Sequence, residues 1–315
     1  MDRQARCAVV GAANIDIGGF PLGRLSLRDS NPGRITLSAG GVGRNIACNL
    51  ARLGVKTWLV AGLGTDAFAD IARSDCARAG VNTDLCLAFD GAASSTYLFI
   101  ADGDGDMQLA VNDMAVCERM TPEALEDRVD ALNGMDAVVL DANLPEQTLV
   151  YLAERLRVPL IADAVSAAKA RRLVPILPRL WAVKPNAIEA EAMTGLPAND
   201  PSQAEAAARR LTALGAGRAF VTLSERGVCC ADARSTRFIP GGPVRMVNAT
   251  GAGDAFTAAL AWALAHGVGE LDACARAGLA AASLAVESRE TVNPEMCEAA
   301  FMERLEAIGS AVPII

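Results

Sequence analysis

The segment Asn248–Ala255 (Asn-Ala-Thr-Gly-Ala-Gly-Asp-Ala) sets small residues and one carboxylate directly before an apolar run. Gly251, Ala252 and Gly253 allow a tight backbone turn, and the Ala-rich run from Phe256 to Leu264 predicts a helix that begins at this turn. The first N–H groups of a helix have no partner within it, and they lie at the positive end of its dipole. The three small residues therefore predict a phosphate-binding turn.

Asp254 falls in the first turn of this predicted helix, beside the predicted phosphate. A carboxylate repels phosphate, so phosphate binding alone does not explain it. Its presence is explained if Asp254 takes the proton from a hydroxyl group that attacks the phosphorus atom. The simpler alternative is an ordinary helix start, in which Asp254 is a favourable first-turn charge and the glycines give flexibility.

The composition narrows the class of protein. The 315 residues, 52% of them apolar, are enough for a large buried core, and the net charge of −8 argues against a nucleic-acid surface. The first six residues are too polar for a signal peptide, and no apolar run reaches about 18 residues, so we expect no membrane span. Nine scattered cysteines without a Cys-x-x-Cys pair indicate reduced thiols and a cytoplasmic protein.

The single histidine, His266, follows an apolar helix and precedes Gly267. This position is typical of a helix C-terminus, where a histidine is favourable with the dipole. No nucleophile motif accompanies it, so a carboxylate is the expected base.

Strand and helix signals alternate along the chain. Near-continuous apolar runs predict buried parallel strands covered by helices on both faces. The predicted strands are Cys7–Gly11, Thr57–Ala61, Ala137–Leu140, Pro159–Ala162, Trp181–Val183, Ala219–Leu223 and Val228–Ala231. The predicted helices are Arg44–Arg52, Ala67–Ala79, Pro145–Leu156, Ile188–Thr194 and Pro201–Leu214.

Two segments interrupt this alternation, residues 17–37 and about 94–112. The second contains two strand-like runs joined by a turn around Gly103–Gly105. We expect the two segments to form a small antiparallel sheet that serves as a lid. The acidic residues Asp102, Asp104 and Asp106 suggest a calcium loop, but the rest of an EF-hand is absent, which favours a solvated hairpin turn.

The turn Gly62–Ala67 (Gly-Leu-Gly-Thr-Asp-Ala) loosely matches a dinucleotide-binding fingerprint, and it leaves a dehydrogenase as a minor alternative. It does not follow the first strand of the chain, and turns of this kind are frequent in parallel α/β proteins.

Five motifs follow one another in a characteristic order. They are Gly11–Asp16, Gly40–Ala47, Lys184–Glu189, Val221–Val228 and Asn248–Asp254. In this order and spacing the chain resembles the ribokinase-like (PfkB) family of sugar and nucleoside kinases, from about residue 8 to residue 295. The resemblance implies one domain over residues 1–315, a three-layer α/β/α fold with a mostly parallel sheet, and a β-sheet lid.

The resemblance also implies an ATP- and Mg²⁺-dependent kinase and a role for each matching residue. Asp254 corresponds to the base, and the amides of Gly251, Ala252 and Gly253 to the anion hole. The positions that hold the sugar hydroxyls in the family correspond to Asn14, Asp16, Gly41, Gly43 and Asn45. The positions that hold the nucleotide correspond to Lys184, Asn186, Glu189, Thr222, Ser224 and Gly227. Of these, Asn186 and Glu189 are expected to organise Mg²⁺ through water. Backbone groups near Asn248 and Thr250 correspond to a monovalent-cation site, with K⁺ the candidate ion.

Three positions depart from the family pattern. Asn248 replaces the usual aspartate before the anion hole, Ser224 replaces a glycine in the nucleotide loop, and Ala69 replaces the last glycine of a Gly-x-Asp-x-x-Gly motif. None of them is the predicted base.

Four segments are most similar to bacterial pseudouridine kinases within this family. They are Asp29–Ile35, Gly40–Ala47, Val111–Met114 and Asp163–Lys169. We therefore expect 5′-phosphorylation of pseudouridine, with base selection by lid residues. The candidates are Ser30, Asn31, Asn112 and Asp113.

Other interpretations stay open. The chain could be a kinase for ribose, another sugar or a purine nucleoside, or a non-catalytic binding protein of the same fold, although the latter would be expected to lose Asp254. The partners expected are small molecules rather than nucleic acid or membrane, and the lid is a candidate surface for a homodimer.

Overall fold

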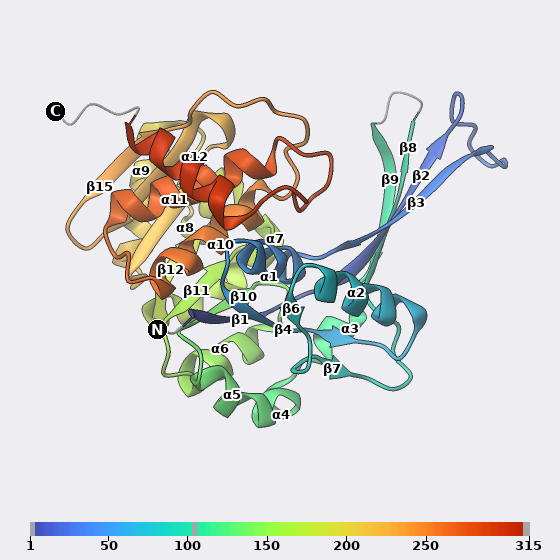
Figure 1. Ribbon diagram of the computed structural model, residues 1–315, viewed down its shortest axis with the longest axis horizontal. Helices are drawn as coiled ribbons and strands as arrows, with labels where there is room; N and C mark the ends of the chain where they lie inside the picture. Colours follow the sequence, from blue (N-terminus) through green and yellow to red (C-terminus); the bar gives the residue numbers. More distant parts are fainter. Residues whose placement is uncertain (1–3, 103–105, 311–315) are drawn as a thin grey trace.

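In the computed structural model, which describes residues 4–102 and 106–310, a nine-stranded sheet forms the centre of the molecule (Figure 1). Its strand order is β15-β14-β13-β12-β11-β10-β1-β4-β6. In chain order the strands are β1 (Arg6–Val10), β4 (Lys56–Val60), β6 (Val81–Asn82), β10 (Ala137–Asp141), β11 (Leu160–Asp163), β12 (Leu180–Lys184), β13 (Arg218–Thr222), β14 (Gly227–Asp232) and β15 (Thr236–Pro240). The seven predicted strands are confirmed, whereas β6 and β15 were not predicted.

The central sheet is parallel from β6 to β13 and antiparallel from β13 to β15. The carboxyl ends of the parallel strands therefore meet at one edge, where ligands bind in open α/β sheets. The motifs that follow β1, β11, β12 and β13 all begin at this edge.

Helices cover both faces of this sheet, which confirms the three-layer α/β/α architecture (Figure 1). One layer contains α1 (Val42–Arg52), α2 (Ala67–Arg78), α10 (Ala252–Ala265), α11 (Leu271–Ala285) and α12 (Glu298–Ser310). The other contains α4 (Pro122–Leu125), α5 (Val129–Asn133), α6 (Glu146–Arg155), α7 (Ala167–Ala170), α8 (Ala187–Thr194) and α9 (Pro201–Ala213). The short elements α3 (Ala115–Glu118), η1 (Glu126–Arg128), η2 (Arg171–Arg179) and η3 (Ser224–Arg226) connect these elements.

Alternation along β1 shows how the sheet divides the core into two parts. Cys7 and Val9 pack into the cluster beneath α1 and α10, whereas Ala8 and Val10 pack into the cluster beneath α6. Successive side chains of a strand point to opposite faces, so a strand covered on both sides is apolar throughout. This is why β1 is an uninterrupted apolar run in the sequence.

The lid is a four-stranded sheet of order β3-β2-β8-β9 that projects from the body (Figure 1). Its strands are β2 (Asn14–Pro21), β3 (Gly33–Gly40), β8 (Thr96–Ala101) and β9 (Met107–Asp113). The expectation of a purely antiparallel sheet was wrong at one pair, because β2 and β8 run parallel. A parallel pair needs a long connection, and here it contains α1 and α2.

A separate pair of short strands, β5 (Gly62–Leu63) with β7 (Leu87–Ala88), precedes β8 in the chain. The predicted turn Gly103–Gly105, with Asp104 of the alternative calcium loop, lies outside the described residues.

The glycines of the Gly62–Ala67 turn have a packing role that accounts for the dinucleotide-like pattern. A Cβ on Gly64 would lie 2.3 Å from the carbonyl oxygen of Ala92, and a Cβ on Gly62 would lie 3.0 Å from Met120. Ala69 replaces a family glycine without strain, because it lies in α2 and donates its N–H to the Asp66 carboxylate that caps this helix.

Among the described residues, no helix is long and apolar enough to cross a membrane. The nine cysteines are all free. His266 ends α10, where its ring stacks on Trp262 at 4.6 Å between ring centres, so it has the helix C-terminal position that the sequence predicted.

Candidate active site

The start of α10 has the geometry of an anion cradle. Gly251 precedes the helix with a φ of +86°, and a Cβ there would lie 2.0 Å from the Thr291 carbonyl oxygen, so only glycine fits. No side chain caps this helix, which leaves its first N–H groups available to a ligand. A Cβ on Gly253 would lie 2.8 Å from Lys184 Nζ, so the absence of a side chain lets the ammonium group approach the cradle.

Asp254 lies in the first turn of this helix and is half-buried. Its Oδ2 accepts a hydrogen bond of 2.8 Å from Asn45 Nδ2, which comes from α1. Burial and the nearby charge of Asp163 raise the pKa of Asp254 to about 7, although the Asn45 hydrogen bond and Lys184 oppose this rise. A carboxylate with a pKa near neutrality is suited to accept a proton.

Lys184 and Asp163 form a buried ion pair at the carboxyl ends of β12 and β11, with 3.0 Å between Lys184 Nζ and Asp163 Oδ2. Thr257, in the second turn of α10, donates a hydrogen bond of 2.6 Å to the same oxygen. Burial alone would lower the pKa of Lys184, but Asp163, Glu189 and Asp254 together raise it. Lys184 is therefore a fixed cation beside the anion cradle.

Asn186 and Glu189 bind each other in a capping box at the start of α8. Asn186 Oδ1 accepts the Glu189 N–H at 2.9 Å, and Glu189 Oε2 accepts the Asn186 N–H at 2.8 Å. Burial raises the pKa of Glu189 despite the opposing charge of Lys184. The capping box fixes the carboxylate in one orientation close to Lys184.

The loop between β13 and β14 lies beside this capping box, because the backbone of Asn186 pairs with that of Thr222. Ser224 has a φ of +54°, a left-handed conformation that glycine adopts more readily than serine. Gly227 has a φ of +120°, and a Cβ there would lie 2.1 Å from the Ile239 carbonyl oxygen. Thr222, Ser224 and Gly227 are thus brought next to the Asn186–Glu189 pair.

The turn after β1 meets the start of α1 very closely. Gly41 has a φ of +94°, and its absent Cβ would lie 2.6 Å from Asn14 Oδ1. A Cβ on Gly43 would lie 2.9 Å from Gly11, so the two backbones touch. This approach brings Asn45, in the first turn of α1, to Asp254.

Asn14 and Asp16 share one face of β2, where Asn14 Nδ2 donates a hydrogen bond of 2.6 Å to Asp16 Oδ1. Burial raises the pKa of Asp16, and the Asn14 hydrogen bond and Arg44 oppose this. The strand leads from the site into the lid, so both side chains lie at the junction of lid and body.

The register of the lid separates the two polar residues of β9. Asn112 pairs with Tyr97, which pairs with Asp16, so Asn112 shares the face of Asp16. Asp113 belongs to the opposite face, and its Oδ1 accepts the N–H of Ala115 at 3.1 Å. Of these two candidates, the structure brings only Asn112 to the polar face of the lid.

Ser30 and Asn31 lie in the turn at the far end of the β2–β3 hairpin. Pro21, at this end, is seven residue steps from Asn14, or about 23 Å along the strand. The side chain of Asn31 is engaged within the turn, because it bonds to the backbone of Ser26 in both directions. The structure does not bring Ser30 or Asn31 to Asp254.

The predicted cation segment precedes the anion cradle. Asn248 Oδ1 accepts the Thr250 N–H at 3.0 Å, and Asn248 Nδ2 donates to the Arg289 carbonyl oxygen at 3.1 Å. The second bond needs an amide donor, which an aspartate lacks. The family departure at Asn248 therefore ties this segment to the loop that also contains Thr291.

Several residues near the site were not predicted as site residues. They are Asn143, Asp163, Lys169 and Thr257 at this edge of the sheet, and Ser38 and Tyr97 on the polar face of the lid. Lys169 Nζ donates a hydrogen bond of 2.5 Å to Asn143 Oδ1 and lies 3.6 Å from Met114 Sδ, at the base of the lid. Asp163 could have been found from its position at the end of an apolar strand. Two residues further on, Val165 has a φ of +65°. The sequence does not predict this left-handed conformation, because β-branched residues rarely adopt it.

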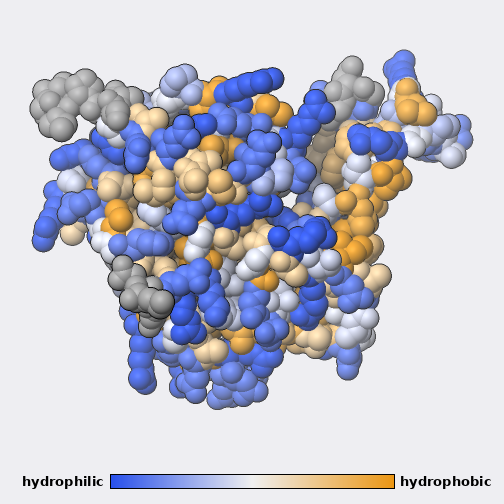
Figure 2. Space-filling view, in the orientation of Figure 1, coloured by the Kyte–Doolittle hydropathy of each residue, from blue (hydrophilic) through white to orange (hydrophobic). Residues whose placement is uncertain are grey.

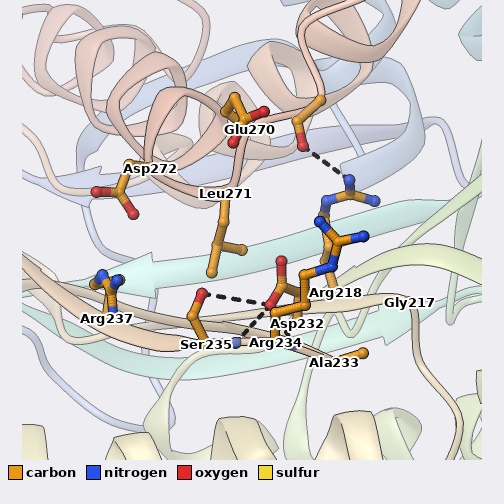
Figure 3. A pocket seen from close by; sticks show the side chains of 11 residues that line it. Gly217, Arg218, Asp232, Ala233, Arg234, Ser235, Arg237, Glu270, Leu271 and Asp272 are labelled. Carbon is orange, nitrogen blue, oxygen red and sulfur yellow. Dashed lines mark hydrogen bonds between the residues drawn. The ribbon is translucent and has the colours of Figure 1, made fainter.

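A cavity of about 630 Å³ lies elsewhere in the molecule (Figure 3). It is lined by Arg218, at the start of β13, and by Glu270 and Asp272, at the start of α11. The motifs converge on the carboxyl end of β13, so this cavity is at the wrong end of the strand. Three arginines and three carboxylates line it, so its charges balance.

The chain matches the model of the "pfkB family carbohydrate kinase" over residues 4–296. The chain belongs to this family. It is 32% identical to the pseudouridine kinase of Escherichia coli (strain K12), with 95% of this chain and 96% of that protein covered. It is 34% identical to an uncharacterized sugar kinase of the same organism, over 94% and 82% of the two chains.

Among solved structures, the ribokinase of Arabidopsis thaliana in complex with ribose and ATP is similar, with a TM-score of 0.86. The two chains are 24% identical, and the alignment covers 96% of this chain and 99% of that one. This likeness shows the fold. The fold and the family predicted from the motifs are therefore confirmed, and the chain has the phosphotransferase chemistry of sugar and nucleoside kinases.

Proposed function

We propose that this protein is an ATP-dependent nucleoside kinase that phosphorylates the 5′-hydroxyl of pseudouridine. The observation that carries the chemistry is the position of Asp254, which has a pKa near 7 and lies directly beside the uncapped start of α10. The similarity to a pseudouridine kinase supports the substrate. The similar identity to a sugar kinase leaves ribose, another sugar or a purine nucleoside as the alternative.

The arrangement supports a direct transfer. Asp254 takes the proton from the 5′-hydroxyl, whose oxygen forms a bond to the γ-phosphorus as the bond to the ADP oxygen breaks. The N–H groups of Ala252 and Gly253 and the ammonium group of Lys184 stabilise the charge on the transferring group. Asn45 holds Asp254 in place from the other side. A non-catalytic binding protein would have no use for a base of this kind.

The residues fit a Mg²⁺ ion and a monovalent cation to different degrees. The fixed Glu189 carboxylate and the Asn186 amide are oxygen donors of the kind that Mg²⁺ prefers, acting here through water. Bound Mg²⁺ would neutralise charge on the ATP phosphates. Both polar atoms of the Asn248 side chain are already hydrogen-bonded, so backbone carbonyl groups of residues 248–250 are the ligands that we propose for K⁺.

The lid is the surface that we propose for a homodimer. One of its faces is formed by apolar residues in register across all four strands, Leu37, Ile17, Leu98 and Val111 in one row and Ile35, Gly19, Ile100 and Leu109 in the next. Ile35 is 72% exposed and Val111 61% exposed. Figure 2 shows apolar residues along the lid. A face of this kind marks an interaction site, and we propose a second copy of this chain as its partner in the cytoplasm.

The test is phosphoryl transfer by the purified protein with ATP, with and without Mg²⁺. ADP formation is measured with pseudouridine, uridine, adenosine, ribose and fructose, and the position of the phosphate in each product is determined by ³¹P NMR. We expect Mg²⁺-dependent formation of pseudouridine 5′-phosphate. ADP formation that needs no divalent ion, or no acceptor-dependent ADP formation at all, would contradict the proposal.

A further inference from the structure

A second cavity, about 290 Å³ in volume, lies behind the site, between α1, α2 and the segment 290–294. Three arginines line it, Arg44 and Arg52 from α1 and Arg78 from α2. Two carboxylates, Asp75 and Glu290, lie opposite them. The lining therefore carries one more positive charge than negative, unlike the larger cavity beside Arg218.

Two N–H groups of these arginines lack an acceptor. Arg44 is only 7% exposed, and its buried Nε has no hydrogen-bond partner among the described residues. The same holds for the buried Nε of Arg52. Asp75 is not the acceptor of either group, since its Oδ2 binds Arg44 Nη2 and its Oδ1 binds Arg78 Nη2. Buried N–H groups of proteins nearly always have an acceptor, so these two point to a ligand.

The thiol of Cys48 also lines this cavity. A hydrogen bond with Cys76, together with the charges of Arg44 and Arg52, lowers the pKa of Cys48 to about 7, although burial opposes this. Part of this shift comes from the positive charges of the two arginines that line the cavity.

Arg44 connects the cavity to the proposed base. Its Nη1 donates a hydrogen bond of 2.9 Å to Asn45 Oδ1, and Asn45 Nδ2 donates to Asp254 Oδ2 at 2.8 Å. Arg44 thus fixes the orientation of the Asn45 amide on one side, and Asp254 accepts its N–H on the other. An anion that holds Arg44 would also hold Asn45 and Asp254.

We propose that this cavity is a second anion site, which takes a small phosphate-bearing ligand and orders the Arg44–Asn45–Asp254 chain when it is bound. The ligand chemistry is a phosphate group, either inorganic phosphate or that of a nucleoside monophosphate. Arginine forks match phosphate geometry, and the cavity has room for such a group. Binding is independent of the proposed function, whereas stimulation of turnover rests on it.

The binding test is calorimetric titration of the full-length protein with inorganic phosphate and, separately, uridine 5′-phosphate, at constant ionic strength. A saturating ATP analogue keeps the cradle at Gly251–Gly253 occupied. We expect Arg52→Gln to weaken phosphate binding by about tenfold or more, the effect of one charge-assisted hydrogen bond. The control Arg209→Gln changes an exposed side chain of α9 and should bind like the wild type.

Arg52 also donates to the Pro294 carbonyl oxygen, so thermal unfolding checks that Arg52→Gln is folded. If Arg52→Gln is unfolded, the test is repeated with Arg78→Gln, because the Arg78 side chain is 68% exposed. Equal affinity for phosphate in the wild type and both variants, or no heat of binding in the wild type, overturns the site. If inorganic phosphate and uridine 5′-phosphate bind with equal affinity, the phosphate group alone is sufficient for binding.

The coupling is tested by kinase activity at increasing phosphate concentration. We expect phosphate to raise the turnover of the wild type and of Arg209→Gln several-fold, and to leave Arg52→Gln at its phosphate-free rate. Phosphate that binds without changing turnover overturns the coupling to Asp254. A protein inactive on every acceptor contradicts the proposed function, while the calorimetric result still decides the site.

Discussion

The start of α10 and the lid hold their functional side chains in different ways. Asp254 is packed within the body, where Asn45 bonds to it and the Asp163–Lys184 pair lies beside it. Asn112 lies on a sheet that projects from the body and is exposed. We infer from this difference that the body carries the transfer chemistry and that the lid selects the substrate, as the proposed function requires.

The largest expected effect is at α10. Asp254→Asn keeps the shape of the side chain and can still accept the Asn45 hydrogen bond, but it cannot take a proton. We expect turnover to fall about 10²–10⁴-fold, the usual contribution of a positioned base. Substrate and ATP binding should be retained in calorimetry. Turnover close to that of the wild type would remove Asp254 as the base.

A smaller effect is expected at the lid. An amide oxygen of Asn112 can accept the ring N–H that pseudouridine has and uridine lacks. Asn112→Ala should therefore reduce kcat/KM for pseudouridine relative to uridine by roughly tenfold to a hundredfold, the effect of losing a buried pairing of about 1–3 kcal/mol.

Asp113→Asn is the matched control, because Asp113 belongs to the opposite face of β9 and caps the turn to Ala115. It should leave the pseudouridine-to-uridine ratio unchanged. If Asp113→Asn lowers this ratio and Asn112→Ala does not, the assignment of the two lid faces is wrong.

The pH dependence of turnover should report on Asp254 in the body. The base acts in its deprotonated form, and burial with the nearby Asp163 charge raises the pKa of Asp254 to about 7. Activity should thus fall about tenfold for each pH unit below 7 and level off above about pH 8. Steady-state rates in buffers of equal ionic strength check this. A rate that is constant down to about pH 5, the range of an ordinary carboxylate, would contradict the raised pKa.

The smallest effect on turnover is expected from the apolar face of the lid. Leu109 is 59% exposed on this face. Leu109→Asp should convert a dimer into a monomer in light scattering, with only a modest change in KM, because the polar face is intact. Leu27→Asp, in the turn beyond the strands, should stay dimeric. A monomeric wild type, or a dimeric Leu109→Asp, would show that this face has no such partner.

Much of α10 could be predicted from local sequence. The small residues at 251–253 and the carboxylate that follows are adjacent in the chain, so their chemistry follows from a helix N-terminus alone. The strands were also predictable, because burial on both faces makes them continuously apolar. The strands β6 and β15 were missed, since one is two residues long and the other contains an exposed arginine and ends in a proline.

The lid could be predicted only in outline. Whether Asn112 or Asp113 shares the face of Asp16 is set by strand register, and a shift of one residue would exchange them. The parallel pairing of β2 with β8 could not be predicted, because α1, β4 and α2 lie between the two strands in the chain and no local signal links them.

Side chains contributed by distant elements were equally hard to predict. Lys169 meets Asn143 and Met114 only because β10, β11 and the base of the lid converge in the folded chain. Thr257 is part of an apolar helix, and its bond to Asp163 depends on the packing of α10 against β11. Arg44 gives no sequence signal for the cavity that it lines with Arg78 of α2.

The most direct test of the proposed function is competition between pseudouridine and uridine for the wild-type protein at limiting ATP and saturating Mg²⁺, with both 5′-phosphates quantified in the same reaction. The ratio of products gives the ratio of the two kcat/KM values. We expect pseudouridine 5′-phosphate to exceed uridine 5′-phosphate by about tenfold or more, the effect of one buried pairing that only pseudouridine completes. Equal amounts of the two products, or preferential phosphorylation of ribose or adenosine when these compete with pseudouridine, would contradict it.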